Sequence, residues 1–117
     1  MDKQTIADEL AALAGWRKDS MGVWDRERRQ LNHPYPVGSL DALEAFRRER
    51  LPGVMLSYLH DYSDTNPEAD PRFRCEASIV RMTDGRPDGC WIKSGRTMWS
   101  SYASALIAAA KENKPNV

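Results

Sequence analysis

The stretch that most constrains the fold is residues 90–111, CWIKSGRTMWSSYASALIAAAK. It begins with a short apolar run typical of a buried strand, continues through a polar turn, and then has apolar side chains three or four residues apart. That spacing places side chains on one stripe of a helix. Such a stripe needs a sheet or another helix to bury it, so the rest of the chain must supply that partner. The stripe consists of Trp99, Tyr102, Ala103, Leu106, Ile107 and Ala110.

Two further helices are predicted upstream. The first follows Thr5 and ends at Gly15, which suits the left-handed position after a helix, and Trp16 is expected to fold back as the apolar contact of that cap. The second covers residues 40–51, and Ser39 is expected to cap its N-terminus.

Strands are predicted from apolar runs and alternation. They cover residues 21–31, 54–62, 73–83 and 90–94. In the second strand, Val54, Leu56 and Tyr58 are expected on one face, and Met55 and Leu59 on the other. The residues 84–89, DGRPDG, read as a hairpin connection.

The predicted order is helix, strand, helix, three strands and helix. It indicates an α+β fold, an α/β sandwich in which a mainly antiparallel four-stranded sheet packs with three short helices. A chain of 117 residues fits one domain, residues 1–117, and 41% hydrophobic with 29% charged residues is typical of a soluble globular protein.

Charge and cysteine content bear on location. Lys plus Arg and Asp plus Glu number 17 each, so there is no overall attraction to nucleic acid or to a membrane. The first residues lack the basic and then apolar run of a secretory signal, and we expect a cytoplasmic location. Cys75 and Cys90 are therefore expected to be free, buried thiols, with a disulfide or a metal pair as the alternative.

A set of local features occurs in a fixed order along the chain: Gly15-Trp16 after a helix, a strand with Trp24, a helix that begins with Ser39, Asp41, Ala42 and Leu43, Cys75 in a strand, and a final alanine-rich helix. These features resemble the phage ABA sandwich domain, a family of small phage and prophage proteins of unknown function. The resemblance would span residues 7–112, and it implies an α/β sandwich, a phage or prophage origin and no established catalytic residues. The chain departs from the family in a longer acidic loop at residues 63–71 and in the large side chains of Met98 and Trp99.

The turn before the last helix is a candidate anion or nucleotide site. A helix N-terminus offers N–H groups and a partial positive charge, and basic and hydroxyl side chains gather here. The alternative is a helix cap with the basic side chains in water, and the glycine spacing of a P-loop is absent. The candidate residues are Lys93, Ser94, Arg96, Thr97, Ser100 and Ser101.

Tryptophans and arginines suggest a partner surface. Tryptophan contributes strongly to protein interfaces; Trp16 and Trp91 are expected in the core. Arginines on the 21–31 strand and the 40–51 helix could form a phosphate-binding stripe if the two are neighbours, but Glu27 and Glu49 favour a self-neutralised face. The candidate partner-surface residues are Trp24, Arg26, Arg28, Arg47, Arg50 and Trp99.

No catalytic set assembles from the sequence. His60, Asp61 and Asp64 could bind a metal, but aspartates in a turn are ordinary turn chemistry. We therefore expect no enzyme activity, no metal and no cofactor. The expected function is binding of a host or phage protein, with antagonism of a host function or defence as its specific form; nucleotide or anion binding is the second hypothesis and nucleic-acid binding the third.

Overall fold

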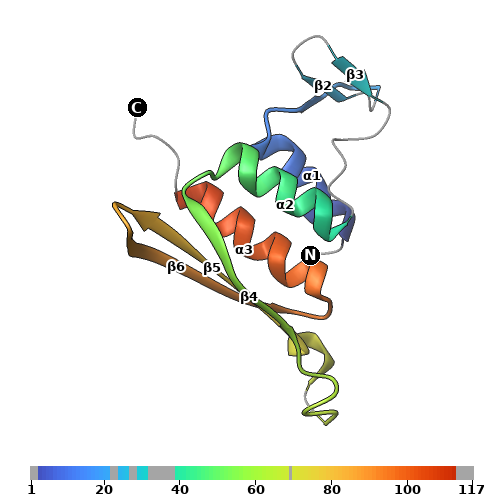
Figure 1. The fold of residues 1–117 in the computed structure, drawn as a ribbon. Coiled ribbons are helices and arrows are strands. Elements are labelled where there is room, and N and C mark those ends of the chain that lie inside the picture. The colour runs from blue at the N-terminus through green and yellow to red at the C-terminus, as the bar shows by residue number, and fades with distance from the viewer. Residues whose placement is uncertain (1–2, 22–23, 27–28, 32–38, 69, 113–117) are drawn as a thin grey trace.

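The computed structural model describes residues 3–21, 24–26, 29–31, 39–68 and 70–112 (Figure 1). The described part contains three α-helices and two antiparallel sheets. The elements are α1 (Lys3–Leu13), β1 (Arg17–Lys18), β2 (Trp24–Arg26), β3 (Arg29–Leu31), α2 (Leu40–Arg50), β4 (Val54–Asp61), the short 3-10 helix η1 (Pro71–Phe73), β5 (Cys75–Thr83), β6 (Arg86–Gly95) and α3 (Met98–Glu112).

The main sheet has three strands in the order β4-β5-β6, so the α+β class is confirmed, and the described residues do not form the expected four-stranded sheet. The strand predicted at residues 21–31 does not join it. The described residues of that stretch form β2 and β3, which pair with β1 in a separate sheet. The stretch carries many charged and few apolar side chains, and such a sequence cannot fill a half-buried row of a larger sheet.

The predicted helix caps at Gly15 and Ser39 are confirmed, whereas α1 already begins at Lys3, so the prediction that the first helix follows Thr5 is wrong. Gly15 has φ 92°, and its N–H donates to the Ala12 carbonyl at 3.1 Å while the Trp16 N–H donates to the Ala11 carbonyl at 3.0 Å. These two bonds close the end of α1 with a left-handed glycine. The Ser39 hydroxyl accepts from the Ala42 N–H at 3.2 Å and begins α2.

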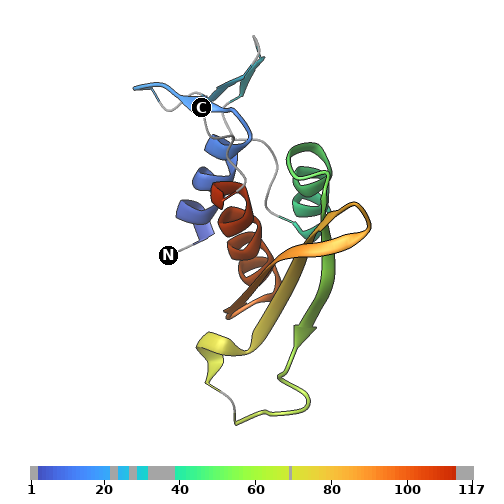
Figure 2. The ribbon, with the colours of Figure 1, turned by 90° about the vertical axis from the view of Figure 1, so that its left-hand side faces the viewer.

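All three helices lie on the same side of the main sheet (Figure 1, Figure 2). The apolar stripe of α3 lies in the core, as predicted, and full burial of a side chain such as Leu106 contributes roughly 1.5–3 kcal/mol. No helix in the described ranges is both long and apolar enough to cross a bilayer. The buried stripe residues are Trp99, Tyr102, Ala103, Leu106 and Ile107, and Ala110 packs against them half-buried.

The β5–β6 hairpin is tighter than predicted. Its turn consists of Asp84 and Gly85, with φ 54° and 77°, so β6 already begins at Arg86 inside the stretch predicted as a connection. Two consecutive positive φ values are typical of a type I′ turn, whose twist matches that of the strands. The turn therefore extends both strands beyond the helices.

Candidate functional site

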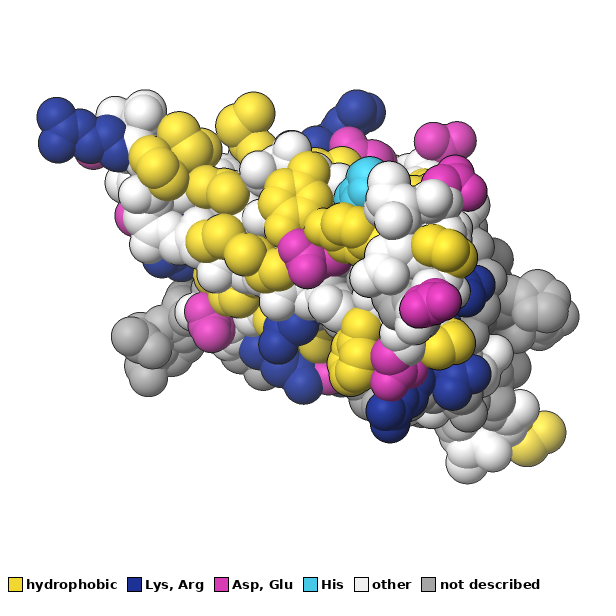
Figure 3. Space-filling view, turned by 90° about the horizontal axis from the view of Figure 1, so that it is seen from below, with side chains coloured by type: hydrophobic (Ala, Val, Ile, Leu, Met, Phe, Trp, Pro, Cys, Tyr) yellow, Lys and Arg dark blue, Asp and Glu magenta, His cyan; other side chains and the backbone are white. Residues whose placement is uncertain are grey.

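The side of the main sheet that faces away from the helices carries exposed hydrophobic side chains. Met55, Tyr58 and Ile92 have 58%, 40% and 54% of their surface exposed. Figure 3 shows hydrophobic side chains gathered across this side of the molecule. We call this surface the open face; it comprises Met55, Tyr58 and His60 of β4, Glu76, Ser78 and Val80 of β5, and Cys90, Ile92 and Ser94 of β6.

Strand register arranges the open face in rows, because residues directly opposite one another in antiparallel strands share a face. Two rows are largely apolar: Met55, Val80 and Cys90 in one, and Tyr58, Ser78 and Ile92 in the next. Ser78 is only 3% exposed between its two large neighbours, and its Oγ lies 3.7 Å from the Cys90 Sγ. These rows therefore present a continuous apolar layer with the small polar group beneath it.

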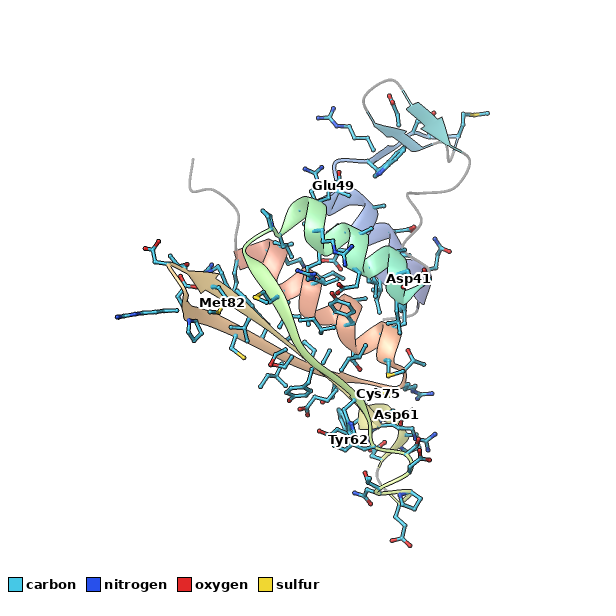
Figure 4. The ribbon with its side chains drawn as sticks, in the orientation of Figure 1. Asp41, Glu49, Asp61, Tyr62, Cys75 and Met82 are labelled. Carbon is cyan, nitrogen blue, oxygen red and sulfur yellow. The ribbon has the colours of Figure 1, made fainter. Side chains whose placement is uncertain are left out.

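The third row, His60, Glu76 and Ser94, is polar. The Tyr58 hydroxyl donates to the Glu76 carboxylate, and this bond raises the pKa of Tyr58 to about 12. The His60 and Tyr62 rings meet edge to face with centroids 4.3 Å apart. Tyr62 lies at one end of the sheet and Met82 at the other (Figure 4). The open face thus changes from apolar near the hairpin to polar at the Tyr62 end.

A bulge in β4 places Tyr58 on this face. Leu56 pairs with Ile79 and Tyr58 pairs with Ser78, so Ser57 is an extra residue in the ladder. An extra residue reverses the alternation of all side chains that follow. The prediction that Tyr58 shares a face with Val54 and Leu56 is therefore wrong, and so is the prediction that Leu59 shares one with Met55; Leu59, opposite Ala77, faces the helices.

The two cysteines lie on opposite faces of the sheet. Both are free thiols, and Cys75 is buried as predicted. The prediction that Cys90 is buried is wrong, because it lies on the open face, which the described helices leave uncovered. Burial raises the pKa of the Cys75 thiol, which makes it a poor nucleophile where it stands.

The hydroxyls of the predicted anion site are engaged in a helix cap. The Thr97 N–H donates to the Ser100 Oγ at 3.2 Å, and the Ser100 N–H donates to the Thr97 Oγ1 at 3.0 Å. Ser101 is fully buried and donates to the carbonyls of Cys75 and Thr97. A Cβ on Gly95 would lie 2.6 Å from the Ser100 Oγ, so the strand end and the helix start are in close contact.

The basic residues of that candidate site, Lys93 and Arg96, are exposed. Lys93 pairs with Ala77 on the helix side of the sheet, whereas Ser94 pairs with Glu76 on the open face, so these two site residues lie on opposite faces. An anion at this helix end would have to compete with the Thr97 and Ser100 side chains for the N–H groups of α3.

Arg47, one of the predicted partner-surface residues, belongs to a polar network between α2, α3 and β4. Its guanidinium donates to Glu44 at 3.0 Å and to the Val54 carbonyl at 2.6 Å. The Tyr102 hydroxyl also donates to Glu44. The hydrogen bond from Arg47 lowers the pKa of Glu44, and burial together with Glu44 raises that of Tyr102. This network connects helices and strand inside the fold.

The other predicted partner-surface residues are not brought together on one described surface. Trp99 is 8% exposed and belongs to the core, and the Arg50 guanidinium donates to the Ala14 carbonyl at the end of α1. The side chains of Trp24 and Arg26, and Arg28 as a whole, lie outside what the structure describes. Trp16 and Trp91 are buried, as predicted.

The acidic turn after β4 shows ordinary turn bonding. The Asp61 carboxylate accepts from the Ser63 N–H at 2.8 Å, and the hydrogen bonds from Ser63 lower the pKa of Asp61. Within the described ranges, no three His, Cys, Asp or Glu side chains are grouped so that they could hold a metal ion.

The open face itself was not predicted from sequence. One signal for it is present, because Cys90 and Ile92 alternate with Trp91, and an apolar residue on both faces of a strand indicates cover on both sides. The number of helices did not reveal that all of them lie on one side.

Comparison with family models, with curated proteins and with solved structures finds no match for this chain. The resemblance to the phage ABA sandwich domain therefore stays a prediction.

Proposed function

We propose that this protein acts by binding another protein, without catalysis, and that the open face is its contact surface. The observation that carries the proposal is the exposure of Met55, Tyr58 and Ile92 on adjoining rows of one face. Contiguous apolar patches on the surface of a protein commonly mark interaction sites, because burying them releases ordered water.

The composition of the patch supports a protein as the partner. Tyrosine and methionine are enriched at protein interfaces. The polar row with His60 and Glu76 borders the apolar rows, an arrangement typical of an interface with an apolar centre and a polar rim. Thr97 and Ser100 are engaged in a helix cap and Arg47 in an ion pair with Glu44, which is consistent with a binding role.

The biological setting is proposed from the resemblance to the phage ABA sandwich domain. On that basis the protein is a phage or prophage accessory protein in the cytoplasm of a bacterial host. Its partner is a host protein, and binding antagonises a host function or defence.

Co-purification from bacterial cells tests the proposal. The full chain with a tag is compared with the double variant Met55→Lys, Ile92→Lys and with the control Met21→Lys, which changes a residue that is 85% exposed outside the main sheet. We expect the wild type and the control to retain the same host protein and the double variant to lose it. Circular dichroism of all three checks that the fold is intact.

Retention of an identical set of proteins by all three forms would contradict the open face as the contact surface. Retention of no protein by the wild type would contradict the binding function.

A further inference from the structure

We propose that the open face binds one amphipathic helix of the partner, with a basic side chain placed at Glu76. This inference rests on the proposed function and names the structural class of the partner segment. It follows from the width of the face, from its gradient of polarity and from the position of one carboxylate.

The width of the open face fits a single helix. Neighbouring strands lie about 4.8 Å apart, so the three strands span about 10 Å from β4 to β6. A helix with its side chains has a diameter of about 10 Å. On the covered side of the same sheet the 15-residue α3 packs along β5 and β6, and α2 packs beside it against β4. A helix on the open face would complete a three-layer arrangement.

The polarity gradient determines which end of the bound helix is polar. Met55 and Ile92 offer apolar contacts near the hairpin, and one apolar stripe with side chains three or four residues apart can cover both rows. The stripe has to end where Glu76 and His60 begin, about 7 Å further along the strands. The helix therefore carries a polar segment at the end nearest Tyr62.

Glu76 selects for a cation in that segment. Its carboxylate already accepts a hydrogen bond from Tyr58 and lies beside the apolar rows. A partner that covers it without a donor would desolvate a charge, which is costly. A lysine or arginine of the helix would instead form a charge-assisted bond at the edge of the interface.

The same carboxylate disfavours a second copy of this chain as the occupant. A two-fold axis parallel to the rows would bring the row of Glu76 over apolar side chains near the hairpin of the other copy. An axis parallel to the strands would instead bring the Glu76 rows of the two copies together, with like charges facing each other.

A display library of 16-residue peptides, panned against the full-length protein, tests the inference. We expect enriched peptides to repeat apolar residues at three- and four-residue spacing and to share a lysine or arginine near one end. Ile92→Lys should weaken them at least about tenfold, and Met21→Lys should leave their affinity unchanged. Glu76→Gln should weaken the peptides with the basic residue and should not weaken matched peptides in which that residue is glutamine.

Three results would contradict the inference that the open face binds a helix. Enriched peptides with strict two-residue alternation would indicate strand addition, and equal binding by Ile92→Lys would place the peptides elsewhere. A wild type that sediments as a dimer, with Ile92→Lys as a monomer, would assign the face to a second copy. In the first case the face still binds protein, so the proposed function stands while the helix fails. If the wild type enriches no peptides and also retains no host protein in the co-purification, both the helix and the proposed function are refuted.

Discussion

The Tyr58 hydroxyl donates a hydrogen bond to the Glu76 carboxylate across β4 and β5, at the border between the apolar and the polar rows of the open face. The bond joins two neighbouring strands on the face that the helices do not cover. It also gives Tyr58 a distinct ionisation behaviour, because removal of its proton would place two negative charges side by side.

Tyr58 is expected to lose its proton at a pH of about 12 instead of the ordinary 10. The difference in tyrosinate absorbance between wild type and Tyr58→Phe isolates this residue during an alkaline titration. In Glu76→Gln the pKa should return toward 10. Because the folded-state pKa is raised, the stabilisation is fully present below pH 10 and disappears as the pH rises through about 12. A difference titration centred near 10 in the wild type would contradict the bond.

Leu106→Ala is expected to reduce the free energy of unfolding by about 2–5 kcal/mol, because it leaves a cavity in the fully buried core. Ile92→Ala, at a residue with 54% of its surface exposed, should cost less than about 1 kcal/mol. Urea unfolding of both variants measures the two values. A similar large cost at both sites would mean that the open face is packed within the free protein.

The thiols are expected to react at very different rates. Cys90 is exposed and should react with a thiol reagent within the folded protein, whereas Cys75 is buried and has a raised pKa. Cys75 should therefore react only as fast as the protein unfolds. Cys90→Ser should remove the fast phase, and Cys75→Ser the slow one. Two fast thiols would show that α3 does not protect Cys75.

Glu44 is expected to contribute to acid sensitivity. Its pKa is lowered by the hydrogen bond from Arg47, so its stabilisation is present above the ordinary value of 4.5 and is lost as the pH falls through the lowered pKa. Urea unfolding at pH values of about 6 and 3 should show a smaller loss of stability in Glu44→Gln than in the wild type. Equal losses in the two proteins would show that the network with Arg47 and Tyr102 is not formed in solution.

Several signals within single helices were predicted correctly from the sequence. The left-handed glycine at Gly15, the cap at Ser39 and the stripe of α3 depend on residues within one or two turns of a helix, and each is confirmed. The spacing of apolar residues determines which side of a helix needs cover, whatever covers it.

The arrangement of layers could not be read in the same way. Which side of a sheet the helices take depends on contacts between distant elements, and the pattern of Cys90 and Ile92 is the same whether they are covered by this chain or by a partner. The absence of a fourth strand from the main sheet, in the part of the chain that the structure describes, has a similar cause, since β2 pairs with β1 and β3, which lie closer in the chain. The bulge at Ser57 left no local mark in the sequence.

That bulge gives β4 one position at which its length can change without moving a side chain to the other face. Loss of Ser57 would leave Leu56 followed directly by Tyr58 in a regular ladder, so Leu59 would still face the helices. Loss of Leu59 would instead bring His60 opposite Ala77, toward the helices. A deletion of equal size in the exposed turn between Asp64 and Glu68 would alter neither surface. Natural variants of this chain should therefore differ in length at that turn and, within β4, at Ser57 alone.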